Sequence, residues 1–199
     1  IILIGRFNVF GHHKRQLDAI EAFLALQQRG VFDESWRFVV AGHLNPGVET
    51  AEYFERCQKR SQGTNVRVEA NLSFSELREL YLRASVLWQF TGTGLPFGVD
   101  PGKCEHLGLV AMDCFAYGTI PVIYQRSGMS SLLNYGVDGF SFGSITELEE
   151  IMRLIAADFG GSYHRELYQN GLARRNDFSL EHFTSQLKSA LAERENHAR

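Results

Sequence analysis

The chain has 199 residues, of which 44% are hydrophobic and 22% are charged, with a formal net charge of −3. These values are typical of a globular domain with one core, and they exclude a disordered chain. The weak negative charge lacks the basic surplus that nucleic-acid binding requires, so we expect no nucleic-acid partner. The 3 cysteines contain no CxxC spacing, which argues against a disulfide framework and a zinc site.

Targeting signals are also absent from the sequence. It contains no apolar stretch of about 20 residues and no signal peptide, which predicts a cytoplasmic location. The chain starts at IILIG without an initiator methionine. We therefore expect it to be one part of a longer protein.

Strand-like and helix-like segments alternate along the whole chain. Strands are predicted at 1–5, 37–42, 65–70, 85–90 and 119–124, and helices at 15–30, 49–60, 75–84, 110–117, 145–157, 162–175 and 179–195. Ser73 with Glu76, and Ser144 with Glu147, have the spacing that caps a helix start. Short apolar strands between longer helices indicate a parallel sheet covered on both faces. We predict a single α/β domain over 1–199, with a Rossmann-like, doubly wound sheet.

In such a sheet, ligands bind beyond the carboxyl ends of the strands. The first loop there, GRFNVFGHHKRQ (5–16), has Arg6 and Lys14 at its two ends. Two cations at one strand end can neutralise the same diphosphate. The alternative is a solvated loop with unrelated basic residues, because no P-loop sequence is present.

The second loop, QFTGTGLPFGVDPGK (89–103), is long and rich in glycine. Gly92, Gly94 and Gly98 have the spacing GxGxxxG, and no helix is predicted to start there, so they do not form a dinucleotide fingerprint. A NAD-binding domain would need GxGxxG after the first strand, and GRFNVFG does not provide it. We expect the long loop to wrap a ligand or to contact a neighbouring domain.

The third loop lies in CEHLGLVAMDCFAYG, where Gly108 precedes a predicted helix. The amides of Gly108, Leu109 and Val110 should form an anion site at the helix N-terminus. The carboxylates of Glu105 and Asp113 are good acceptors for the vicinal hydroxyls of a sugar or a ribose. The alternative is that both acids only stabilise the start of the helix.

A family resemblance is carried by six segments in one order: GRF with GHHKRQLDAIEAF, VVAG, SELRELYLRASV, EHLGLVAMDCFAYGTIPVI and SGMSSLLNYGVDGF. Over nearly its whole length the chain resembles the C-terminal, donor-binding domain of family 4 glycosyltransferases. These are retaining enzymes with the two-domain GT-B fold. Their E-x7-E motif matches Glu105 to Asp113, with aspartate as the second acid.

The resemblance implies a role for each matching residue. Arg6 and Lys14 would bind the diphosphate of a nucleoside diphosphate sugar, Glu105 would contact the transferred sugar, and Asp113 would hold the ribose. The glycine turn from Gly108 through Leu109 to Val110 would bind sugar and phosphate oxygens. The base would pack around Val68 to Ala70, which includes Glu69. Glu105, Arg6 and Lys14 are thus the expected catalytic residues.

The resemblance also implies what the chain works with. The donor sugar nucleotide is a substrate, no cofactor is expected, and the absence of D-x-D indicates a site without a metal. An N-terminal domain of the same protein would bind the acceptor, which is a glycan, a lipid or a small molecule. Through that domain the protein would attach peripherally to a membrane.

Two other functions are considered for the same residues. A non-catalytic glycosyltransferase-like module would bind a nucleotide sugar or a partner protein without transferring anything. Asp113 and Ser131, at positions where the family usually has glutamate, favour this alternative. A glycosidase would use two carboxylates around a sugar, but here one acid lies among amides that suit a phosphate.

Overall fold

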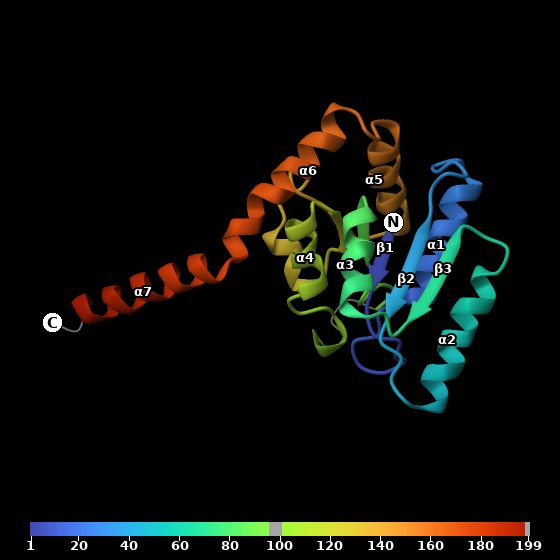
Figure 1. Ribbon diagram of the computed structural model, residues 1–199, viewed down its shortest axis with the longest axis horizontal. Coiled ribbons are helices and arrows are strands. Elements are labelled where there is room, and N and C mark those ends of the chain that lie inside the picture. The colour runs from blue at the N-terminus through green and yellow to red at the C-terminus, as the bar shows by residue number, and fades with distance from the viewer. Residues whose placement is uncertain (96–100, 198–199) are drawn as a thin grey trace.

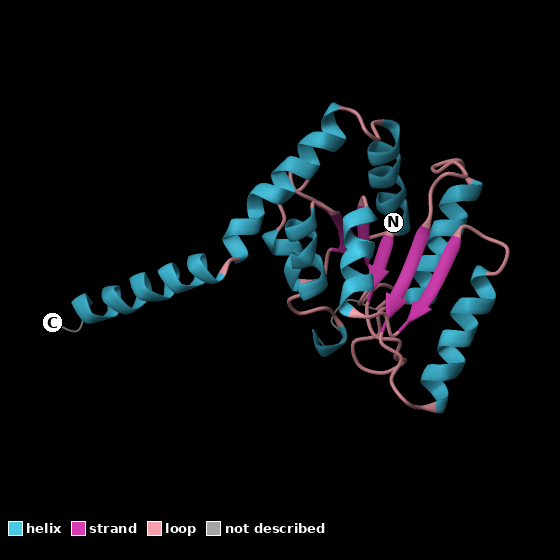
Figure 2. Ribbon diagram, in the orientation of Figure 1, coloured by secondary structure: helices cyan, strands magenta, loops and turns pink. Residues whose placement is uncertain are grey.

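The computed structural model describes residues 1–95 and 101–197, and in this part of the chain six parallel strands form one sheet (Figure 2). The strands are β1 (Ile2–Ile4), β2 (Phe38–Gly42), β3 (Val66–Ala70), β4 (Val86–Gln89), β5 (Ile120–Tyr124) and β6 (Phe140–Phe142). Their order is β3-β2-β1-β4-β5-β6, so the order reverses between β1 and β4. This is the doubly wound sheet that the sequence predicts.

Each predicted helix is present, with ends that differ from the prediction by at most about two residues. The helices are α1 (Gln16–Gln28), α2 (Val48–Ser61), α3 (Phe74–Arg83), α4 (Leu109–Tyr117), α5 (Ile145–Ala157), α6 (Ser162–Arg174) and α7 (Leu180–His197). Helix α7 extends away from the body of the molecule (Figure 1). Among the described residues, no helix is long and apolar enough to cross a membrane.

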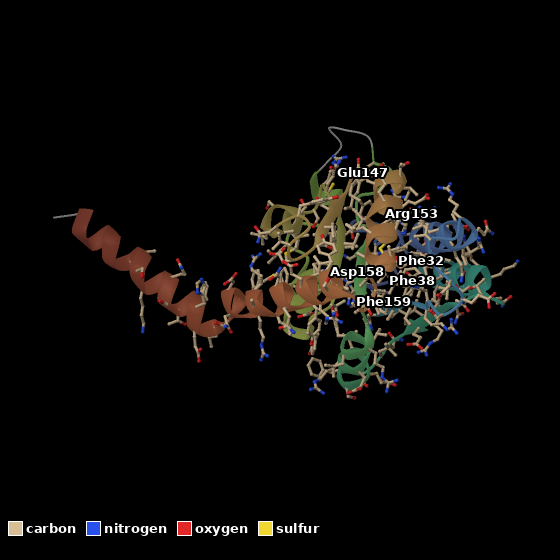
Figure 3. All side chains as sticks on the ribbon, turned by 90° about the horizontal axis from the view of Figure 1, so that it is seen from above. Phe32, Phe38, Glu147, Arg153, Asp158 and Phe159 are labelled. Atoms are coloured by element: carbon tan, nitrogen blue, oxygen red, sulfur yellow. The ribbon has the colours of Figure 1, made fainter. Side chains whose placement is uncertain are left out.

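The larger core lies on the sheet face that α1, α2 and α5 cover. It is centred on aromatic rings: Phe23 stacks on Phe32 with a centroid distance of 5.4 Å, and Trp88 of β4 lies 5.2 Å from Phe38 of β2. Phe32 and Phe38 are labelled in Figure 3. Full burial of one such side chain contributes about 1.5–3 kcal/mol, so this face anchors β1, β2 and β4 in register.

The opposite face is covered by α3 and α4. Ile2, Val39 and Leu87 of neighbouring strands pack there against Tyr81 of α3 and Cys114 of α4. Residues that alternate along β4 therefore face two different cores, because successive strand side chains point to opposite faces. Helix α4 begins at the carboxyl edge of the sheet, beside the point where the strand order reverses.

Strand β6 (Phe140–Phe142) corrects the prediction of five strands. It pairs with β5 from Val122↔Phe140 to Tyr124↔Phe142. Its three residues stand between Gly139 and Gly143, which is too short a run to show an alternating pattern. The pairing with β5, which no local pattern encodes, makes this segment a strand.

Both predicted helix caps are present. Ser73 and Glu76 form the reciprocal capping box of α3. Ser144 accepts a hydrogen bond from the Glu147 amide at the start of α5, while the Glu147 carboxylate accepts one from the Gly143 amide. In both helices a side chain satisfies an amide that lacks an intrahelical partner.

The capping box of α3 can be tested directly. We expect Ser73→Ala to lower the free energy of unfolding by about 1 kcal/mol, because it leaves the Glu76 amide without its acceptor. Urea unfolding followed by circular dichroism measures this change. Ser189→Ala, at an exposed position inside α7, is the control and should cause no loss. Equal stability of both variants would contradict the assignment of the cap.

Candidate functional site

An ion pair joins two predicted site residues that are 91 residues apart in the sequence. The Lys14 ammonium contacts the Glu105 carboxylate, and the two side chains are only 18% and 14% exposed. Lys14 ends the β1 loop (residues 5–15), and Glu105 belongs to the motif loop (residues 104–108) before α4. The structure therefore brings the predicted diphosphate-binding loop into contact with the acidic motif.

A second contact joins the same two loops. The imidazole rings of His12 and His106 lie with centroids 4.7 Å apart. The stem of Lys14 also packs against the β1 loop itself, since a Cβ on Gly5 would lie 2.6 Å from Lys14 Cγ. These contacts place a cation and a carboxylate at the point where the strand order reverses, which is where ligands bind in this type of sheet.

The turn at Ser127 and Gly128 contacts the backbone of the motif loop. The Gly128 amide donates a 2.9 Å hydrogen bond to the Glu105 carbonyl. A Cβ on Gly128 would lie only 1.6 Å from the carbonyl oxygen of His106, so no other residue fits there without a backbone shift. Backbone contacts thus set the position of Glu105 independently of its ion pair.

The N-terminus of α4 has the geometry of an anion site. Gly108 is the N-cap, with a φ of 69° and no side-chain cap in the described part of the chain. The Ala111 amide donates to the Gly108 carbonyl at 2.8 Å. The amides of Leu109 and Val110 have no acceptor within the helix, and they carry the positive end of the helix dipole.

Asp113 lies one turn inside α4 and faces α3. Its Oδ2 accepts a 3.3 Å hydrogen bond from the Tyr81 hydroxyl, which also lies 3.0 Å from the Val110 carbonyl. Burial raises the pKa of the Asp113 carboxyl, and the Tyr81 hydrogen bond lowers it only in part. No acid lies in the first turn of α4. Asp113 therefore lies beyond the first turn, where a carboxylate would interact best with the helix dipole, whereas Glu105 precedes the N-cap.

Arg6 is exposed and lines a cavity of about 260 Å³ at the carboxyl ends of β1, β2 and β3. The cavity is lined by Ile4, Gly5, Arg6, Ala41, Gly42, His43, Asn71, Leu72 and Leu77. Asn71 links the segments that follow β2 and β3, since its side chain accepts a 2.9 Å hydrogen bond from the Leu44 amide. No motif in the sequence marks this cavity, although Gly42 ends β2 and Asn71 follows β3.

The predicted base contacts, Val68 and Glu69, both lie inside β3, and their contact with a base stays a prediction. The Val68 side chain packs against the larger core, and Glu69 forms an ion pair with Arg67 on the other face. Strand side chains project to the two faces of the sheet and not beyond its edge. Neither side chain lines the cavity at the strand ends, which the residue after the strand, Asn71, does line.

Two further expectations concern metals and the glycine-rich loop. The described residues contain no group of three or more histidine, cysteine or acidic side chains that could hold a metal ion. Positions 96–100 of the loop, including Gly98, lie outside the described residues. In the described part of this loop, Gly92 and Gly94 have positive φ angles of 93° and 71°.

Known proteins with similar sequences belong to one enzyme family. Residues 1–171 match the family described as "Glycosyl transferases group 1". The chain is 22% identical over 124 residues to a glycogen synthase from Chlamydia muridarum. The aligned residues are 62% of this chain and 24% of that protein. The chain therefore spans about a quarter of the length of this curated relative.

Solved structures share the fold at low sequence identity. Anabaena Alr3699/HepE, in complex with UDP and glucose, matches 96% of this chain and 48% of its own chain, with 16% identity and a TM-score of 0.68. A glycosyltransferase from Rickettsia africae matches 96% of this chain and 47% of its own, with 13% identity and a TM-score of 0.70. The C-terminal domain of the Francisella tularensis group 1 protein LpcC matches 90% and 86%, with 14% identity and a TM-score of 0.64. These neighbours show a GT-B type fold.

The environment of Asp113 predicts how stability depends on pH. Because burial raises its pKa in the folded state, the carboxyl ionises first in the unfolded chain, and stability falls as pH rises through that range. We expect Asp113→Asn to melt at or above the wild-type temperature at pH 7, with the difference vanishing towards pH 3. Differential scanning calorimetry across this range measures the effect.

Asp18 provides the matched control for Asp113. It lies in the first turn of α1, where a carboxylate favours the helix dipole, so Asp18→Asn should lower the melting temperature at pH 7. A comparable decrease in Asp113→Asn would show that this carboxylate stabilises the helix after all.

Proposed function

The chain belongs to the glycosyl transferases group 1 family, and we propose that it is the donor-binding half of a family 4, retaining glycosyltransferase. Its ligand would be a nucleoside diphosphate sugar. The observation that carries this proposal is the contact of Lys14 with Glu105 beside the N-terminus of α4. A cation, a carboxylate and unpaired amides at one sheet edge suit a ligand that has both phosphates and hydroxyls.

The diphosphate would lie between the β1 loop and α4. Lys14 and Arg6 would neutralise its charge, and the amides of Gly108, Leu109 and Val110 would donate to its oxygens. In sugar transfer, negative charge develops on the leaving diphosphate, so these groups would stabilise the transition state more than the ground state. Donor groups of the chain itself would thus take the role that a divalent cation has in other sites.

The two acids would take the two ends of the ligand. Glu105, held next to Lys14, would accept hydrogen bonds from the transferred sugar. Asp113 would hold the ribose hydroxyls, for which it would exchange the long hydrogen bond from Tyr81. The base would enter the cavity between Gly42, His43 and Asn71, at the carboxyl end of β3, the strand that contains Val68 and Glu69.

Transfer would need a second half of the protein. This chain spans 48% of the HepE structure and 47% of the Rickettsia structure. We propose that an N-terminal domain binds the acceptor and closes over the donor, so that the sugar is transferred with retention to an acceptor hydroxyl. A peripheral membrane position through that domain is part of the same proposal.

Isothermal titration calorimetry with UDP, GDP, ADP and dTDP tests the proposal. We expect at least one of these nucleotides to bind, and binding to persist in EDTA, because the proposed site neutralises phosphate with side chains and amides. The HepE structure, which contains UDP, makes UDP the first choice. Absence of binding by all four nucleotides would reject the function, and a loss in EDTA that Mg²⁺ restores would reject the metal-free site.

The two cations should contribute to binding in different ways. We expect Arg6→Ala and Lys14→Ala each to weaken nucleoside diphosphate binding by about 1.5–3 kcal/mol, the value of a hydrogen bond to a charged group. Only Lys14→Ala should also lower the melting temperature, since it leaves Glu105 without its ion pair, whereas Arg6 is exposed.

Arg60→Ala is the control for these two variants. It removes the same charge from α2, where Arg60 pairs with Glu21, and it should leave the affinity unchanged. Wild-type affinity in both Arg6→Ala and Lys14→Ala would remove the β1 loop from the site.

A further inference from the structure

The face of β4 that points towards α4 changes from apolar to polar at the carboxyl edge. Leu87 packs in the apolar core, but the next residues on that face are Gln89, which is 8% exposed, and Thr91, which is 0% exposed. The residues between them, Trp88 and Phe90, point to the larger core on the other face. A buried amide and a buried hydroxyl thus replace apolar side chains where the strand reaches the site.

These buried polar groups have no hydrogen-bond partner in the part of the chain that the structure describes. Both amide atoms of Gln89 and the hydroxyls of Thr91 and Thr93 are shielded from solvent and unpaired. The other buried unpaired atoms are Asn8 Oδ1, His13 Nε2 and His164 Nε2. Except for His164 Nε2, these atoms lie at the end of β4 or on the segments that follow β1 and β4. Leaving a buried polar group unpaired is unfavourable, and folded proteins contain few such groups.

The position of these groups follows from the sheet register. Gln89 pairs with Ile123 of β5, and Ile123 packs against Ala111 in the first turn of α4. Leu87 packs against Cys114, one turn further along the helix. Because α4 runs opposite to the strands, Gln89 and Thr91 lie under the start of α4, beside the loop that holds Glu105.

We propose that Gln89 and Thr91 form a hydroxyl-binding subsite that recognises the sugar of the donor, an inference that rests on the proposed function. A neutral amide and a hydroxyl both donate and accept hydrogen bonds, which matches neighbouring sugar hydroxyls and not a phosphate. The sugar reaches them by displacing the turn at 92–95, where Gly92 and Gly94 have positive φ. A sugar without the matching hydroxyls leaves the groups unpaired and is rejected.

The chain offers a matched control for each residue. Gln16 is also buried, but its amide nitrogen donates to the carbonyls of Gly5 and Arg6, and its oxygen accepts from Tyr53. Thr119 is as buried as Thr91, but its hydroxyl donates to the Tyr81 carbonyl at 3.2 Å. Within each pair, the residue type is the same and both residues are buried, but the hydrogen bonding differs.

The test compares the melting temperature and the affinities for UDP and UDP-glucose in four variants. We expect Gln89→Met and Thr91→Val to melt at or above the wild-type temperature, because an apolar side chain of similar shape removes unpaired groups. Gln16→Met and Thr119→Val should melt lower. Gln89→Met and Thr91→Val should bind UDP normally, yet each should lose about 3- to 10-fold of the affinity that glucose adds to UDP. Thr119→Val should keep both affinities.

The possible failures are distinguishable. If the wild type binds none of UDP, GDP, ADP and dTDP, the proposed function and the subsite both fail. If UDP binds but UDP-glucose gains nothing over it, or if both variants keep the gain, the subsite alone is wrong. Lower melting of Gln89→Met with an unchanged gain would assign the amide to internal water and to structure.

Discussion

All strands of the described sheet end at one edge, and the reversal of their order between β1 and β4 brings the β1 loop against the motif loop. The ion pair of Lys14 with Glu105 exists only because of this arrangement. It places the cation, the carboxylate and the first turn of α4 within one small region. Every element of the candidate site is defined by its position relative to this pair.

The same edge contains most of the buried, unpaired side-chain atoms of the described residues. Gln89 and Thr91 are buried without partners, and Asp113 keeps a carboxylate half-buried with one long hydrogen bond. Close to the amino edge, equivalent groups such as Thr119 are satisfied by backbone carbonyls. The aromatic core around Trp88 provides stability for the sheet as a whole, so the carboxyl edge can leave polar groups available for a ligand.

At the motif loop, backbone contacts set the position of the chain, and side chains provide the charged and hydrogen-bonding groups. The Gly128 amide donates a hydrogen bond to the Glu105 carbonyl, and Gly128 packs closely against the His106 carbonyl. These two contacts fix the position of the motif loop. Side chains then only need to provide charge and hydrogen bonds. The exchange of partners by Lys14 and by Asp113 that we propose for donor binding would leave this backbone frame in place.

Local sequence patterns determined the elements of this protein, because strand runs, helical spacing and the capping pair of Ser73 with Glu76 depend on neighbours within a few residues. The pattern from Glu105 to Asp113 likewise predicted the candidate site from one segment. Only the tertiary structure decided that Lys14 contacts Glu105 and that β6 is a strand. It also decided that the cavity lies at Asn71, since these features depend on strand order and register between residues distant in sequence.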